Sequence, residues 1–160
     1  MNAEVLPEDM RGERAFVNYL LKQRDDGRTD KVPAIAGEQP SGLASTTDPD
    51  TWSFIDRAQA GLRWASGIGF VFAGGYVGVD LDDCIDNGTL HSAAQDLVTR
   101  LDGYAELSPS GNGVHVIVRG SLDGWPRNRT KQTPWGGGLE VYEHGRFFTL
   151  TGNTITGGTQ

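Results

Sequence analysis

Three carboxylates crowd into four positions at the end of an apolar run, in the stretch GVDLDD at 78–83. Alternate side chains of an extended strand share a face, so Asp80 and Asp82 project together, about 6 to 7 Å apart along the chain, while Leu81 points into the core. Charge at the edge of a core is costly unless it is paired or binds a metal. The spacing favours a carboxylate pair that holds a hard cation, and a solvated strand end is the alternative. Asp83 faces the other way and is suited to capping the next turn.

A histidine and a further acid occur in two later strand-like stretches, SPSGNGVHVIVRG at 108–120 and GGGLEVYEHGR at 136–146. His115 is expected on the strand face opposite to the valines, and Glu140, which alternates with apolar neighbours, is a candidate third metal ligand. The loop before the histidine offers hydroxyl and backbone N–H groups that suit phosphate oxygens, from Ser108, Ser110, Gly111 and Gly113. Oxygen donors without the His or Cys spacing of a zinc site favour Mg²⁺ or Mn²⁺.

A small basic and aromatic segment follows the histidine strand. Between 119 and 131 it carries four cations against the single acid Asp123, and Trp125 and Trp135 lie within or beside it. Such a segment can follow a single-stranded template, with cations at phosphates and aromatic rings against bases. The alternative is a solvated loop. The candidate nucleic-acid-binding residues are Arg119, Arg127, Arg129 and Lys131.

Composition bounds the class of protein. A chain of 160 residues with 37% hydrophobic and 22% charged residues is typical of one soluble globular domain, which we expect to span 1–160. The net charge of −7 argues against an indiscriminately basic nucleic-acid coat. One cysteine, Cys84, allows no internal disulfide, and we interpret it and His91 as structural or surface residues. The chain shows neither a signal peptide nor a membrane-spanning run, so we expect a cytoplasmic protein that does not contact a membrane.

The first half of the chain is expected to contain two helices. An apolar stripe at 16–21 predicts the first. The turn-rich stretch 25–50 predicts a surface loop or irregular arm, because its prolines and glycines exclude a long regular element. Asp48 and Pro49 form an N-cap and first-turn pair that opens a second helix, which ends by Gly61.

From Ile68 onward the period of the apolar residues changes to two. The stretch 68–81 predicts a hairpin that turns at Ala73–Gly75. A third helix follows at 90–101 and stops at Gly103. Two more hairpins are predicted, one from YAELSPS to VHVIVRG and one from LEVYEH to RFFTLTG. Three hairpins and three helices predict an α+β domain with an antiparallel-rich sheet and packed helices.

In this order, GVDLDD, SPSGNGVHVIVRG and GLEVYEHGRFFTLTG resemble the three motifs of the archaeo-eukaryotic primase superfamily. The resemblance is to the primase-polymerase domains at the N-terminus of phage and plasmid replication proteins. It extends upstream through KVP at 31–33, STTDPDTW at 45–52 and GIGFVF at 67–72. It implies a primase-polymerase catalytic core with the acids on an RRM-like sheet.

The resemblance also implies roles at matching positions. Asp80 and Asp82 match the first-motif acids and Glu140 the third-motif acid, which together hold two Mg²⁺ or Mn²⁺ ions. His115, with Ser110 before it, matches the second motif, which contacts the phosphates of the incoming nucleotide. We add Arg146 as a phosphate ligand from its charge and position. The implied catalytic set is Asp80, Asp82, His115 and Glu140.

The implied activity is template-directed nucleotidyl transfer by a DNA primase and polymerase. Its partners are nucleoside triphosphates, a single-stranded DNA template, a primer and a replicative helicase. Because the sequence stops soon after the third motif, we expect either a piece of a longer replication protein with a C-terminal helicase or a minimal catalytic module.

Three other functions match parts of the sequence. A haloacid-dehalogenase-like phosphatase also begins with DxD, but Asp83 and Cys84 occupy the positions where its glycine and threonine should stand. Sugar-nucleotide glycosyltransferases carry a DxD too, but their architecture is longer and leaves the histidine motif unexplained. From a non-enzymatic class, the chain is a nucleotide- or nucleic-acid-binding accessory module with a weak site.

Overall fold

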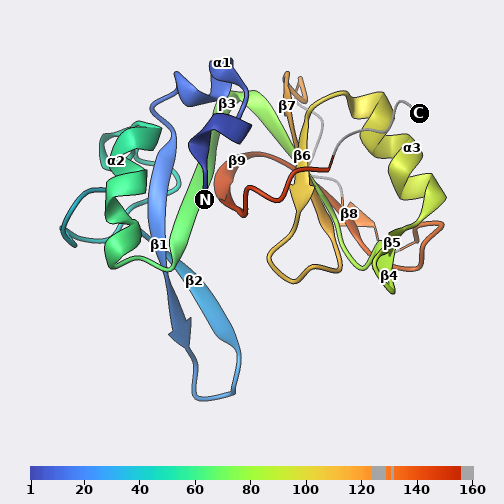
Figure 1. Ribbon diagram of the computed structural model, residues 1–160, viewed down its shortest axis with the longest axis horizontal. Coiled ribbons are helices and arrows are strands. Elements are labelled where there is room, and N and C mark those ends of the chain that lie inside the picture. The colour runs from blue at the N-terminus through green and yellow to red at the C-terminus, as the bar shows by residue number, and fades with distance from the viewer. Residues whose placement is uncertain (124–128, 131, 156–160) are drawn as a thin grey trace. The chain divides into compact units, whose positions relative to one another are not determined.

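The computed structural model describes residues 1–123, 129–130 and 132–155 (Figure 1). The chain divides into two compact units. The first holds Met1–Ala73 and His144–Leu150, and the second holds Gly74–Glu143 and the chain from Thr151 onward. Among the described residues, no helix combines the length and apolarity needed to cross a membrane. The predicted α+β class is confirmed, and every strand pair with a described register is antiparallel.

The first unit is built on the antiparallel hairpin of β1 (Phe16–Gln23) and β2 (Thr29–Ala34), which Figure 1 shows in blue. The helix predicted over 16–21 is therefore wrong. Phe16 and Val17 are completely buried, and Leu21 is largely exposed, so burial fades along a strand instead of following a helical period. A short apolar run suits either element, and pairing with β2 and with β3 (Gly67–Leu81) decides for the strand.

The loop predicted over 25–50 is also corrected, because β2 lies inside it. This strand contains Pro33 and stands at the end of the order β2-β1-β3. An edge strand tolerates a proline because one side of its backbone needs no ladder partner. The turn residues at 25–28 then close the hairpin, and the local signal for an irregular segment holds only outside β2.

Short helices accompany this hairpin. Asp48 caps a turn, as predicted, with its side chain accepting the Asp50 N–H at 3.1 Å. The turn is 3₁₀, and the α-helix proper starts later and ends before Gly61. The helical elements of the first unit are η1 (Ala3–Val5), α1 (Glu8–Arg11), η2 (Pro49–Thr51), α2 (Ile55–Ala60) and η3 (Gly61–Arg63).

β3 is one long strand and not the predicted hairpin. Gly74 and Gly75 adopt positive φ values of 96° and 75°, as turn glycines do, but the chain continues in the same strand. Its first part pairs with β1 in the first unit, and its second part, Tyr76–Leu81, pairs with β7 (Val114–Arg119) in the second. Permissive glycines allow a reversal of the chain, but the available partner strands decide whether it occurs.

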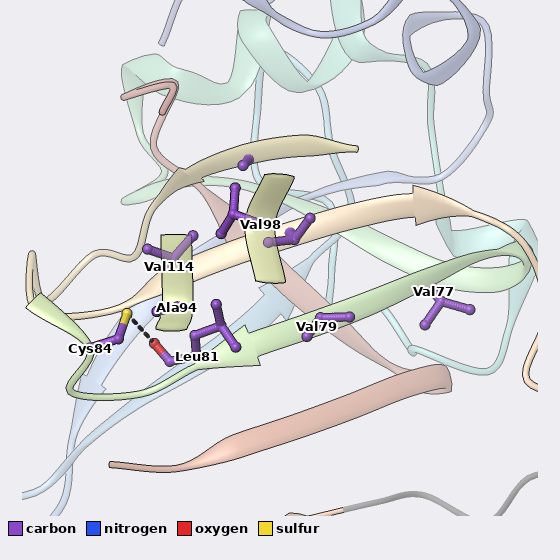
Figure 2. Close-up of a cluster of buried hydrophobic side chains, with 9 residues drawn as sticks. Val77, Val79, Leu81, Cys84, Ala94, Val98 and Val114 are labelled. Atoms are coloured by element: carbon purple, nitrogen blue, oxygen red, sulfur yellow. Dashed lines mark hydrogen bonds between the residues drawn. The ribbon is translucent and has the colours of Figure 1, made fainter. Parts of the chain in front are cut away.

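The second unit places α3 (Ser92–Leu101) on one face of β3, β6 (Tyr104–Leu107) and β7. Figure 2 shows Leu81, Cys84 and Val114 gathered around Ala94 of this helix. The helix and the β6–β7 hairpin confirm the prediction. The other elements of this unit are β4 (Ile85–Asp86), β5 (Thr89–Leu90) and β8 (Arg129–Thr130).

Cys84 and His91 both have structural roles, as interpreted. The Cys84 thiol is buried in this core and donates to the Leu81 carbonyl oxygen at 3.3 Å, and burial raises its pKa to about 11. The His91 Nδ1 atom accepts the Ala93 N–H at 3.2 Å and so caps the start of α3.

β9 (Leu139–Leu150) is likewise continuous where a third hairpin was predicted. Gly145 has a φ of 68° inside it, and the strand runs on through His144. β9 pairs with β3 and with β8, so its neighbours come from elsewhere in the chain instead of from its own second half.

Candidate active site

Asp80, His115 and Glu106 stand side by side on three adjacent strands of the second unit. His115 of β7 is opposite Asp80 of β3 on one side and Glu106 of β6 on the other. The His115 Nε2 atom lies 3.7 Å from Asp80 Oδ1, and its Nδ1 atom lies 4.0 Å from Glu106 Oε1. The imidazole thus sits between two carboxyl groups.

The alternate residues of the same strands point to the other face. Leu81 and Val114 are completely buried in the core beneath α3, and so is Val116, which lies one residue after His115. This alternation confirms that Leu81 faces the core and Asp80 the opposite face. Asp82 stands in the turn after β3, so its place on the face of Asp80 remains a prediction. The charged row is therefore supported from behind by a packed apolar layer.

Asp82 stands in the turn directly after β3 and is flanked by glycines. Its backbone N–H donates to the Gly138 carbonyl oxygen at 2.9 Å. A Cβ atom on Gly138 would come within 3.2 Å of Asp82 Oδ2, and one on Gly113 would come within 2.7 Å of the Leu81 carbonyl oxygen. Side chains are thus absent where they would crowd the exposed Asp82 carboxylate, to which no described residue donates a hydrogen bond.

The predicted phosphate loop closes tightly against this face. A Cβ atom on Gly113 would lie 3.1 Å from the Ser108 hydroxyl, which in turn lies 3.0 Å from the Ser110 hydroxyl. Gly111 has the positive φ of a turn, 77°. The loop uses some of its own N–H groups: that of Ser108 donates to Gly113, that of Gly111 to Ser108 and that of Asn112 to Ser110. The two hydroxyl groups, more than a ring of free N–H groups, are what this loop offers to a ligand.

Glu140 lies on β9 with Leu139 and Val141 packed against the α3 core on either side of it in sequence. Strand alternation therefore turns Glu140 toward the opposite face, which is the face of Asp80. β9 pairs with β3, and the hydrogen bond between Asp82 and Gly138 stands two residues before Glu140. Glu140 as a third ligand remains a prediction.

The donor set suits a hard cation in part. Over the described ranges, no three His, Cys, Asp or Glu side chains are gathered as a complete ligand group. Mg²⁺ is usually held by one or two carboxylates together with substrate phosphates and waters, and not by an all-protein cage. The paired carboxylates of Asp80 and Asp82 fit that mode of binding.

The predicted cations are spread over the chain. The Arg119 guanidinium packs 4.9 Å from the centre of the Tyr76 ring and donates to its hydroxyl at 3.1 Å, on the sheet face of His115. Arg129 is opposite Glu140 in the β8–β9 register. Arg146 belongs to the first unit, so its contact with phosphate stays a prediction. Arg127 and Lys131 lie outside the described residues, as does Trp125.

Trp135 has a structural contact that the template interpretation did not include. Its indole N–H donates to the Asp82 carbonyl oxygen at 2.9 Å, and its ring packs against the α3 core. It thereby holds the end of β3 in place next to the acids.

Glu106 is a site residue that the sequence interpretation missed. It is completely buried, and burial raises its pKa, although hydrogen bonds from Thr151, Tyr104 and Gly152 act in the opposite direction. The available signal was its position in the stretch YAELSPS, where an acid stands between apolar residues of a strand that leads directly into the histidine hairpin.

Comparison with known proteins gives one informative match. No protein-family model matches the chain. The chain is 43% identical over 120 residues to a DNA primase-polymerase of Nitratiruptor phage NrS-1. The matched segment covers 71% of this chain and 17% of that protein. The chain thus corresponds to a small part of this relative. This similarity confirms the resemblance to a phage DNA primase-polymerase.

Proposed function

We propose that this chain is the catalytic domain of a DNA primase-polymerase, with an RRM-like primase-polymerase core spanning 1–160. Its reaction is attack of a primer 3′-hydroxyl on the α-phosphorus of a nucleoside triphosphate, with pyrophosphate as the leaving group. The observation that carries the proposal is the row of Asp80 and His115 on neighbouring strands, with Asp82 two residues after Asp80 in the turn that follows β3. The similarity to a phage DNA primase-polymerase supports it.

Asp80, Asp82 and Glu140 are the proposed ligands of Mg²⁺ or Mn²⁺. When bound, two such ions stabilise charge on the attacking and leaving oxygens of a phosphoryl transfer. The protein contributes carboxylates on strands whose other face is packed against α3, so their positions are held before substrate arrives.

His115 and the serine loop are the proposed phosphate contacts. His115 is almost completely buried, and its Nε2 atom is turned toward Asp80. The hydroxyl groups of Ser108 and Ser110 lie 3.0 Å apart, and that of Ser108 lies next to Gly113. These groups supply hydrogen bonds where negative charge gathers on the transferred group. Arg146 is retained as a further phosphate ligand.

The template is proposed to follow the cations beyond the histidine strand. Arg119 is held over Tyr76 by a cation–π contact and a hydrogen bond, which orient its guanidinium group. Arg127, Arg129 and Lys131 extend this set. The proposed partners are a single-stranded DNA template, a primer and a replicative helicase, in the cytoplasm of a host cell.

The test is extension of a labelled primer on a single-stranded DNA template with each nucleotide type and either Mg²⁺ or Mn²⁺. The test variant is Asp80→Ala/Asp82→Ala. A charge-matched control is Asp86→Ala/Asp96→Ala, which removes two exposed carboxylates of the same unit. We expect incorporation by the wild type and the control, and none by the test variant.

Equal incorporation by both variants would remove Asp80 and Asp82 from the mechanism. If the wild type binds nucleotide and DNA but incorporates no nucleotide, the chain is an accessory binding module and not an enzyme.

A further inference from the structure

Glu106 is a carboxyl group enclosed by hydrogen-bond donors. Its Oε2 atom accepts the Tyr104 hydroxyl at 2.7 Å and the Gly152 N–H at 2.9 Å, and its Oε1 atom accepts the Thr151 N–H at 2.9 Å. The residue has 0% exposure. A buried carboxyl group is costly, and these three bonds offset much of that cost.

The same group faces the histidine of the proposed site. Glu106 Oε1 is 4.0 Å from His115 Nδ1, on the side of the ring away from Asp80. That separation is longer than a hydrogen bond, and contacts of this kind often tighten only when substrate is bound. Because three donors already point at Glu106, the carboxyl group acts here as an acceptor.

We propose that Glu106 is the positioning residue of His115. It accepts the Nδ1 hydrogen of the imidazole and so holds the ring with Nε2 turned toward the acids and the nucleotide phosphates. The inference rests on the proposed function, since it names what orients the phosphate-binding histidine. Partners behind a functional histidine commonly set its tautomer and ring orientation in this way.

A purely structural role for Glu106 makes a different prediction. Its bonds to Thr151 and Gly152 fasten this part of the chain beside β6, and their loss alone would lower stability. Tyr104→Phe is the matched control, because it removes one bond to Oε2 and leaves Oε1 facing His115. A purely structural role predicts that Glu106→Gln lowers the free energy of unfolding while the nucleotide affinity of the folded variant, like that of Tyr104→Phe, stays close to the wild-type value.

The first experiment is a double-mutant cycle on the affinity for a deoxynucleoside triphosphate in the presence of Mn²⁺. Glu106→Gln is expected to weaken binding about tenfold or more, and the double variant with His115→Ala to bind no more weakly than His115→Ala alone. Tyr104→Phe should bind within about twofold of wild type. Additive losses, or equal affinity of Glu106→Gln and wild type, would overturn the proposal.

The second experiment reads the imidazole nitrogens of the folded wild type by NMR. His91 is an internal contrast, because its Nδ1 accepts a hydrogen bond and so carries no hydrogen, whereas His115 should carry one on Nδ1. A hydrogen on the His115 Nε2 atom alone would overturn the proposal even if Glu106→Gln fails to fold. If the wild type binds no nucleotide, the proposed function fails, while this spectrum still decides whether Glu106 orients His115.

Discussion

The two faces of the sheet in the second unit are made by the same strands, but one is apolar and the other is charged. One face is buried in the core beneath α3 and is formed by Val79, Leu81, Val114 and Val116. Asp80 and His115 turn the other way into a charged row that continues to the buried Glu106. Neighbours one residue apart thus belong either to the stability of the fold or to its chemistry.

This difference teaches how the protein holds carboxyl groups close together. Burial of like charges is unfavourable, so the charged row needs a rigid support and specific partners. The apolar face supplies the support through α3, and hydrogen bonds to Glu106 supply partners at one end of the row. If the faces are functionally separate, substitutions on one should leave the other intact.

The largest effect is expected from Asp82→Ala on the charged face. We expect incorporation to fall at least about a hundredfold, because even outer partners of metal ligands typically cost 10- to 100-fold. Asp82 is exposed, so the free energy of unfolding should change by no more than about 0.5 kcal/mol. Primer extension and urea unfolding measure the two quantities, and a large loss of stability would contradict the separation of the faces.

Leu81→Ala, at the residue before Asp82, should lower the stability and leave the rate of incorporation unchanged. Removing a completely buried side chain is expected to lower the free energy of unfolding by about 2–5 kcal/mol. The rate of incorporation per folded molecule should stay close to that of the wild type. Urea unfolding measures the stability, and primer extension with an active-site titration measures the rate per folded molecule. A fall in this rate as large as that of Asp82→Ala would show that the two faces are coupled.

Gly113→Ala tests the close approach of the serine loop to the end of β3. The new Cβ atom would stand 2.7 Å from the Leu81 carbonyl oxygen, so the strand must shift, at a cost of about 1–3 kcal/mol, and nucleotide affinity should fall. Gly88→Ala, between β4 and β5 and outside the proposed site, is the control: its Cβ would meet nothing within 4 Å, and only the positive φ is unfavourable. We expect that control to lose about 1–2 kcal/mol of stability with unchanged nucleotide affinity. Equal affinities of the two variants would contradict a role of Gly113 in the site.

The smallest effect concerns the pH dependence of stability at the buried end of the row. Burial raises the pKa of Glu106, so the folded protein holds its proton to higher pH than the unfolded chain does. Its contribution is fully present below the ordinary value of 4.5 and is lost as pH rises through the folded pKa. Relative to Glu106→Gln, wild-type stability should therefore decline over that range. Urea unfolding at several pH values measures this difference, and a constant difference would rule out the shift.

Local pattern predicted several elements correctly. Alternation assigned Asp80, Leu81 and His115 to their faces, and helical spacing located α3. The β6–β7 hairpin was predictable because its partners are close in sequence and joined by a glycine-containing turn. By contrast, the apolar stripe at 16–21 suits a helix or a strand, and the glycines of β3 and β9 permit a turn without requiring one. Those choices were made by the partner strands, which are β2 and β3 for β1, β1 and β7 for β3, and β3 and β8 for β9.

The sequence by itself determined the chemical types of the site and their faces: carboxylates at Asp80 and Asp82, an imidazole at His115, and alternation that separates them from the core. Only the tertiary structure decided the register that brings Glu106 behind His115 and glycines beside Asp82. The physical reason is that side-chain direction follows from the two-residue period of one strand, whereas register depends on the geometry of the turn and on packing between strands.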